Sequence, residues 1–213
     1  MSTRLSNRTL KPEAAPSPPL TARTDPRAGS ILLGLARQAI TSRGAPEPST
    51  RNDPAWLAEP GAAFVTLTRD GALRGCVGSV EPHRSLRDDV RRNACAAAFH
   101  DPRFPPLPAT EVPLVCLEVS LLSATESLRF TSREDLLEQL RPGSDGVVLR
   151  WHGHHAAFLP QVWQQLPEPE EFLEHLLHKA RLPVTFWEPG LSVRRFTVTA
   201  WREDRPSGAK GTP

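Results

Sequence analysis

Asp70-Gly71 is the feature that most constrains how this chain folds. The pair separates residues 63–69 from residues 72–80, and both runs are rich in strand-forming side chains. An Asp-Gly pair favours the two-residue turn that joins antiparallel strands, so the sequence predicts a β-hairpin here. A second hairpin is predicted over residues 146–159, around His152-Gly-His154.

Other segments repeat apolar side chains at helical spacing and are predicted to be helices. Asp25-Pro26 has the form of an N-cap followed by proline at the first helical position, and Gly44 stops the helix that begins there. Ser85, with Asp88 three residues on, opens a second helix. Two more are predicted over residues 132–140 and 169–180.

The order of these segments decides the fold class. Residues 115–121 and 191–201 alternate apolar and polar side chains, as half-buried strands do. Strands therefore come in hairpins, and helices stand between groups of strands. This order predicts an α+β fold with a mainly antiparallel sheet and helices packed on it. A Rossmann or P-loop fold is not favoured, because Gly75-Cys-Val-Gly78 lies within or just after a strand.

The two ends of the chain differ in composition from its middle. Residues 1–24 are polar and proline-rich, and residues 204–213 are similar, so we predict disordered tails around a folded part at residues 25–203. No apolar run approaches the ~20 residues that span a bilayer, and the N-terminus lacks the apolar stretch of a secretory signal. We therefore expect no membrane association and a cytoplasmic location.

Charge and cysteine content argue against nucleic-acid binding, a disulfide framework and a zinc site. The net charge of +2, with arginines spread along the chain, gives no footprint for nucleic acid. Cys76, Cys95 and Cys116 are odd in number and widely spaced, which suits a reducing compartment and makes no zinc pattern. The histidines at the tip of the second hairpin and on the last helix lack the supporting ligands of a metal site. We expect neither a metal nor a cofactor.

The densest chemistry lies in Leu73-Arg-Gly-Cys-Val-Gly78. On a regular strand, Arg74 and Cys76 point to the same face, about 7 Å apart, where a guanidinium favours the thiolate. With a two-residue turn, Arg74 pairs with Leu67, and Cys76 pairs with Val65.

Two interpretations of this segment stay open. In the first, Gly75 and Gly78 leave bare backbone on either side of a reactive Cys76, where a ligand or a partner can approach. In the second, Cys76 is a small buried side chain in a strand whose glycines let a helix pack closely.

Three further residues are candidates for the same site. Asp101 and Arg103 follow the second predicted helix; they close a salt bridge or, alternatively, Arg103 supplies a second cation to the hairpin. Glu118 stands on the polar side of its predicted strand, and if that side is covered its carboxylate needs Arg74 or Arg103 as partner. Ser120 shares that side, but no histidine is placed to activate it.

Five segments combine into a longer pattern: Leu73-Arg-Gly-Cys-Val-Gly78, Asp101-Pro-Arg-Phe-Pro-Pro-Leu107, Glu118-Val-Ser-Leu-Leu-Ser123, Phe158-Leu-Pro-Gln-Val162 and His178-Lys-Ala-Arg-Leu182. With them the chain resembles the AMMECR domain family, whose prokaryotic members are called AmmeMemoRadiSam system protein A. The similarity runs in order over residues 28–203. Arg181 stands where the family usually has glycine, and Val77 where isoleucine is commoner.

The resemblance implies an α+β fold in which two β-α subdomains contribute to one curved, mainly antiparallel sheet. It also implies genomic association with a Memo-like protein and a radical S-adenosylmethionine (radical SAM) protein. It carries no established reaction, so whether the protein is an enzyme stays open, as does its oligomeric state.

Two hypotheses about function follow. In the first, the chain is a cytoplasmic component of a radical-SAM-linked modification or metabolic system. Arg74 and Arg103 then hold an anionic group, Cys76 acts as thiolate or hydrogen donor, and Glu118 orients an arginine. In the second, the chain is a non-enzymatic adaptor that docks a partner protein through its Arg74-to-Gly78 surface. A concave, water-accessible site favours the first and a flat patch the second.

Overall fold

The computed structural model of the protein describes residues 21–45 and 53–204. Most of both predicted tails therefore lies outside the described residues. Thr21–Arg23 forms a short 3-10 helix with Ala22 fully buried, so the folded part includes Thr21, four residues before the predicted boundary at residue 25. Among the described residues, no helix is long and apolar enough to cross a membrane.

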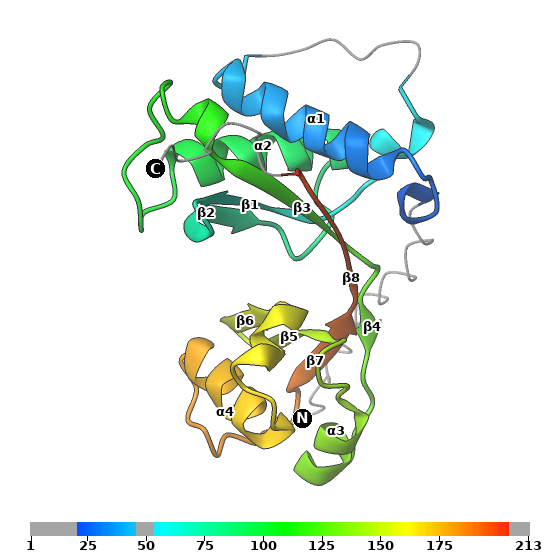
Figure 1. The fold of residues 1–213 in the computed structure, drawn as a ribbon. Coiled ribbons are helices and arrows are strands. Elements are labelled where there is room, and N and C mark those ends of the chain that lie inside the picture. The colour runs from blue at the N-terminus through cyan, green and yellow to red at the C-terminus, as the bar shows by residue number, and fades with distance from the viewer. Residues whose placement is uncertain (1–20, 46–52, 205–213) are drawn as a thin grey trace, which may run out of the picture.

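The described chain folds into two subdomains, each with an antiparallel four-stranded sheet and two α-helices (Figure 1). The predicted α+β class is confirmed, but the strands divide into two sheets where the resemblance implied one. The first subdomain has the sheet order β2-β1-β3-β8 and contains α1 (Ala28–Thr41), β1 (Ala63–Arg69), β2 (Ala72–Gly78), α2 (Leu86–Phe99), β3 (Cys116–Leu122) and β8 (Val198–Arg202). The second has the order β4-β7-β5-β6 and contains β4 (Glu126–Ser127), α3 (Arg133–Gln139), β5 (Gly146–Trp151), β6 (His154–Phe158), α4 (Pro169–Lys179) and β7 (Ser192–Phe196).

The two long helices of the first subdomain begin differently. Helix α2 starts as predicted, with the Ser85 hydroxyl accepting a hydrogen bond from the Asp88 N–H at 3.2 Å. Helix α1 has Arg27 as its N-cap, and the Asp25 carboxylate accepts from the Arg27 N–H at 2.9 Å. Asp25 therefore caps the turn before the helix, and Pro26 does not occupy the first helical position. The predicted start of this helix is wrong by two residues.

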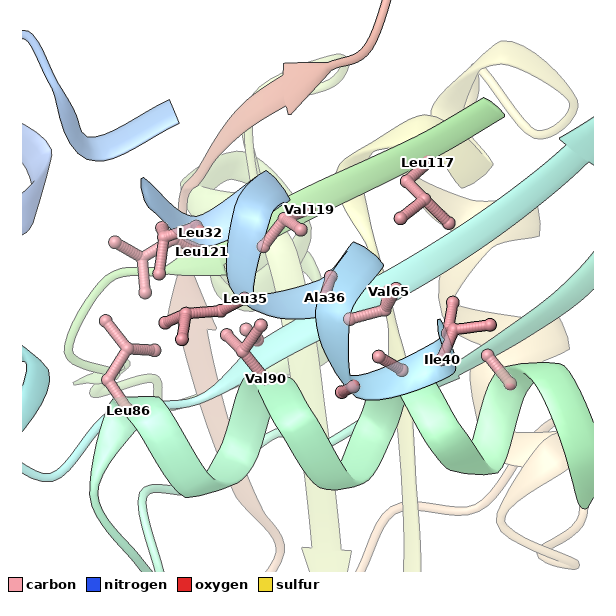
Figure 2. Close-up of a cluster of buried hydrophobic side chains, with 14 of the residues drawn as sticks. Leu32, Leu35, Ala36, Ile40, Val65, Leu86, Val90, Leu117, Val119 and Leu121 are labelled. Carbon is pink, nitrogen blue, oxygen red and sulfur yellow. The ribbon is translucent and has the colours of Figure 1, made fainter. Parts of the chain in front are cut away.

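Helices α1 and α2 lie together on one face of the first sheet (Figure 1). Gly75 of β2 faces α2 so closely that a Cβ at this position would lie 2.1 Å from the carbonyl oxygen of Ala97. Figure 2 shows the apolar cluster that these helices form with β1 and β3; its labelled members are Leu32, Leu35, Ala36, Ile40, Val65, Leu86, Val90, Leu117, Val119 and Leu121.

The single strand predicted at residues 191–201 is two strands in different sheets, with Thr197 between them. There the Ser123 N–H donates to the Thr197 carbonyl oxygen at 2.8 Å, and the Thr197 N–H donates to the Ser123 hydroxyl at 2.9 Å. The chain thus crosses between the subdomains twice at one place. A buried apolar cluster that includes Leu122, Val148 and Phe196 joins the two sheets.

We expect Gly75→Ala to lower the free energy of unfolding by about 2–3 kcal/mol, because the added methyl group must displace the backbone of α2. Gly34→Ala is the matched control: a Cβ at Gly34 meets nothing within 4 Å, and alanine in a helix is favoured over glycine by roughly 0.5–1 kcal/mol. Urea unfolding followed by circular dichroism measures both variants. A Gly75→Ala variant as stable as the wild type would contradict the close packing of β2 on α2.

Candidate functional site

The hairpin that carries the cysteine contains a β-bulge. Close to the turn, Thr68 pairs with Leu73; farther along, Thr66 pairs with Cys76. Arg74 is the extra residue between these two pairs, and an inserted residue shifts the register of everything beyond it. The turn itself is as predicted. The pairs predicted from it, Arg74 with Leu67 and Cys76 with Val65, are wrong.

Arg74 is engaged by the loop between α2 and β3. Its Nε lies 3.2 Å from a carboxylate oxygen of Glu111, and its Nη1 donates to the Pro105 carbonyl oxygen at 2.9 Å. The side chain of Arg74 is only 13% exposed. Its guanidinium therefore holds this loop to the hairpin and does not make the predicted pair with Cys76.

Arg103 is the arginine that approaches Cys76. Its Nη2 donates to the Cys76 carbonyl oxygen at 3.1 Å. The hydrogen bonds that Arg103 donates to the Asp101 carboxylate raise the pKa of Arg103 most, and the Cys76 side chain adds to the rise. Arg103 also forms the predicted salt bridge with Asp101, at 2.7 Å. Both residues are hydrogen-bonded to the hairpin at Cys76.

The Asp101 carboxylate holds the backbone of Cys76 from the edge of the sheet. It accepts a hydrogen bond from the Cys76 N–H at 2.9 Å, and the Arg103 guanidinium keeps the pKa of the Asp101 carboxyl well below its usual range. Since β2 is an edge strand, Asp101 and Arg103 satisfy backbone groups that another strand would otherwise pair with.

Cross-strand pairing brings Cys76 and Glu118 into one row on the sheet face that α1 and α2 leave uncovered. Thr66 pairs with both of them, and Glu118 pairs with Arg202. The Thr66 hydroxyl donates to the Cys76 sulfur at 3.3 Å. Because neighbouring strands lie about 4.8 Å apart, the backbones of Cys76 and Glu118 are about 10 Å apart. The arginine that pairs with Glu118 across the strands is thus Arg202, whereas the sequence predicted Arg74 or Arg103 as its partner.

This uncovered face borders a cleft between the two subdomains. A cavity of about 470 Å³ is lined by Glu118 and Ser120 on one side and by residues of the second subdomain, including Ser144 and Gln161, on the other. The Ser120 hydroxyl donates to Glu118 at 3.4 Å. A neighbouring cavity of about 430 Å³, with Phe64 in its wall, also contains Gln161. Since Gln161 lines both, we treat the two cavities as one interdomain cleft.

The two candidate glycines lie on opposite faces of β2. Gly75 is packed against α2, which is the role described above as the alternative to ligand binding. Gly78 lies on the other face, where a Cβ would be 2.2 Å from the ring of Phe64. Phe64 pairs with Gly78 and so stands next to Cys76 along β2. The backbone expected to be bare on either side of the thiol is therefore covered, by α2 and by Phe64.

Lys179 lines the same cleft and was not a candidate from the sequence. Its ammonium group donates to the Ala157 carbonyl oxygen at 3.0 Å and lies 4.9 Å from the centre of the Phe158 ring. Burial lowers the pKa of Lys179. The sequence signal that could have found it is its place in His178-Lys-Ala-Arg-Leu182, at the end of the amphipathic helix α4.

The structure shows no metal site among the described histidines and cysteines. His154 Nδ1 lies 2.9 Å from the Ala180 carbonyl oxygen. Within residues 21–45 and 53–204, no group of three or more His, Cys, Asp or Glu side chains is arranged to hold a metal ion. Cys76 and Cys95 are half-buried, Cys116 is buried, and all three are free thiols.

Comparison with known proteins gives the family. The sequence model of the AMMECR1 family matches residues 33–201. The chain belongs to the AMMECR1 family. It is 34% identical over 200 residues to a protein of Thermofilum pendens (84% of this chain, 92% of the relative) and 36% identical over 181 residues to one of Methanothermobacter thermautotrophicus (83% and 94%). The crystal structure of the uncharacterized protein PH0010 from Pyrococcus horikoshii matches with a TM-score of 0.76 and 32% identity, covering 85% of this chain and 94% of that one.

Three of the five segments that carry the family resemblance line the interdomain cleft. Glu118, the Phe158-to-Val162 segment and Lys179 contribute to its walls. Cys76 lies in the same row as Glu118, on the bordering face. The fifth segment supplies Asp101, which holds the backbone of Cys76. The predicted site residues that the structure brings together are thus Cys76, Asp101, Arg103 and Glu118; Arg74 and Gly75 are directed elsewhere, and Gly78 lies beneath Phe64.

We expect Asp101→Asn to lower the free energy of unfolding by about 2 kcal/mol at neutral pH, because the amide cannot replace the charge-assisted hydrogen bonds to Cys76 and Arg103. The pKa of Asp101 is lowered in the folded protein. Its carboxylate therefore stabilises the fold above the unfolded Asp pKa of about 3.9, and this contribution is lost as the pH falls through the lower folded pKa. Urea unfolding should show the difference between wild type and variant shrinking from about pH 5 to about pH 2. A difference that is constant over this range would contradict the assignment.

Proposed function

We propose that this AMMECR1-family protein binds a small molecule in the interdomain cleft and acts on it through Cys76. The observation that carries the proposal is the placement of Cys76 and Glu118 in one row on the sheet face that borders the cleft. Small-molecule sites are concave and hold a few polar groups among apolar ones. The cleft has this character, which supports a site for chemistry over a flat docking patch.

The side chains around the row define the proposed roles. Arg103 donates to the Cys76 carbonyl oxygen at 3.1 Å, which brings positive charge to the residue whose thiol is the proposed nucleophile. Glu118, with Ser120 and Arg202 as neighbours, accepts or donates a proton. Thr66 lies between the two groups, so a substrate bound over Thr66 is within reach of both.

We also propose that the protein works in the cytoplasm with a Memo-like protein and a radical SAM protein. The support for these partners is the family resemblance. Three free cysteines suit a reducing compartment. With these partners, the proposed reaction would belong to a radical-SAM-linked modification or metabolic system.

A second candidate function is partner docking through the tip of the same hairpin. One observation favours it: Leu73, next to the hairpin turn, is a large apolar side chain that is 43% exposed. Arg74 gives this alternative little support, since its guanidinium is held by Glu111 and Pro105. As a non-enzymatic adaptor, the protein would use Leu73 and not the cleft.

We expect iodoacetamide to alkylate Cys76 about tenfold faster than Cys95 at neutral pH, because the thiolate is the reacting form and the Cys95 thiol resists deprotonation. Burial raises the pKa of Cys95, the other half-buried thiol, which makes it the internal reference. Mass spectrometry of the separate peptides gives both rates as a function of pH. A Cys76 thiol that stays inert up to about pH 9 in the native protein would remove the proposed nucleophile.

Arginine variants separate the charge of Arg103 from its structural effect. Arg103→Ala should slow alkylation of Cys76 several-fold, and Arg103→Lys should restore most of the rate by keeping the positive charge. Arg74→Ala is the matched control, since it removes an arginine that is bound to the loop and not to Cys76. Equal slowing in Arg74→Ala and Arg103→Ala would show that loop disturbance, and not local charge, controls the thiol.

The docking alternative is tested by capture of the purified Memo-like and radical SAM partners. If the hairpin tip docks a partner, Leu73→Glu abolishes capture because it places a charge in an apolar contact. Val184→Glu is the matched control, with a residue 42% exposed in the second subdomain. We expect both variants to capture the partners to the same extent as the wild type, because the cleft proposal gives Leu73 no part in the function. Loss in Leu73→Glu alone would establish the adaptor role.

A further inference from the structure

The more apolar part of the interdomain cleft is lined by cationic side chains and, among the described residues, by no carboxylate. This cavity, of about 430 Å³, is lined by residues of both subdomains, with apolar walls that include Phe64, Val148 and Leu159. The charged or titratable side chains that line it are Arg150, His155 and Lys179, and none of its described lining residues is acidic. Its volume lies within the range of small-molecule sites. An apolar space with only positive charge suits an anion that has an apolar body.

Within the part of the chain that the structure describes, Lys179 is a cation of this cavity without an acidic partner. Arg150 is paired with Glu81 at 2.7 Å. Lys179 makes no ion pair within the described chain; its one hydrogen bond goes to the Ala157 carbonyl oxygen at 3.0 Å. An ammonium group carries three N–H donors, so two remain for a ligand. The Phe158 ring, 4.9 Å away, holds the ammonium group in place through a cation–π contact.

We propose that this cavity binds a small organic acid whose anionic group is held by Lys179 and whose apolar body lies against Phe64. The inference rests on the proposed function and specifies its substrate class. Phe64 pairs with Gly78, two residues from Cys76 along β2, so the apolar wall of this cavity adjoins the hairpin that carries the thiol. Glu118 and Ser120 line the other part of the same cleft.

Two dyes with the same aromatic body and different charge test the proposal. Anilinonaphthalene sulfonate is an anion with an apolar body, and phenylnaphthylamine is its uncharged analogue. Fluorescence titration of the full chain should show that Lys179→Met weakens binding of the sulfonate about tenfold and leaves the uncharged dye unchanged, because one charge-assisted hydrogen bond is lost. Lys179→Arg, which keeps the charge, should retain sulfonate binding.

Arg43→Met is the matched control. Arg43 lies over the Phe99 ring at 5.3 Å, at a separate cavity of about 670 Å³, and so pairs a cation with an aromatic wall in the same way. We expect this variant to bind the sulfonate like the wild type. Sulfonate affinity that survives Lys179→Met, equal loss of both dyes in that variant, or loss in Arg43→Met alone would each overturn the proposal. Iodoacetamide labelling of Cys76 is read separately, so failure here is distinguishable from failure of the proposed function.

Discussion

The carboxylate of Asp101 is the contact on which the geometry around Cys76 depends. It is 5% exposed, accepts the N–H of Cys76 and holds Arg103, which returns to the Cys76 carbonyl oxygen. Both backbone groups of an edge residue are thereby satisfied from outside the sheet, which closes that position to strand addition. The backbone of Gly75, one residue earlier, is pressed against α2 on the opposite face. Asp101 and Arg103 therefore fix the backbone of Cys76 at the sheet edge, and the packing of Gly75 on α2 fixes it on the covered face. The Cys76 side chain is left to point to the uncovered face.

The shape of the cleft depends on how the subdomains are joined. Near Ser123 and Thr197, two chain crossings are hydrogen-bonded to each other and backed by a buried apolar cluster. The ion pair between Glu81 and Arg150 also links the subdomains, but the Arg150 side chain is 45% exposed. A solvent-exposed ion pair contributes only about 0–1 kcal/mol, far less than a buried apolar cluster. Opening of the cleft is therefore opposed mainly at the crossings and much less at the ion pair.

Local sequence patterns predicted the elements, and tertiary contacts decided their finer geometry. The Asp70-Gly71 turn and the Ser85 cap are both present, because each depends on residues close in sequence. The bulge at Arg74 was not predictable from the turn, because it depends on contacts with Glu111 and Pro105, more than thirty residues away. The break between β7 and β8 at Thr197 was not predictable for the same reason. Apolar and polar side chains continue to alternate through Thr197, and the contact that marks the change of sheet is its pair of hydrogen bonds with Ser123, far away in the sequence. For the site, the residue types were predictable, whereas the identity of the arginine beside the thiol was not.

The source of that arginine matters for what the site can do. On a regular strand, Arg74 would occupy the same surface as Cys76 and leave less room for a substrate. The bulge instead sends Arg74 into the loop, and Arg103 approaches from the edge, bonded to the Cys76 carbonyl oxygen. Positive charge therefore reaches the thiol without filling the uncovered face, where Thr66 and Glu118 stand. The proposed site thus uses two separate cations: Arg103 is bonded to the backbone of Cys76, and Lys179, on the other subdomain, lines the cleft where the anionic ligand is proposed to bind.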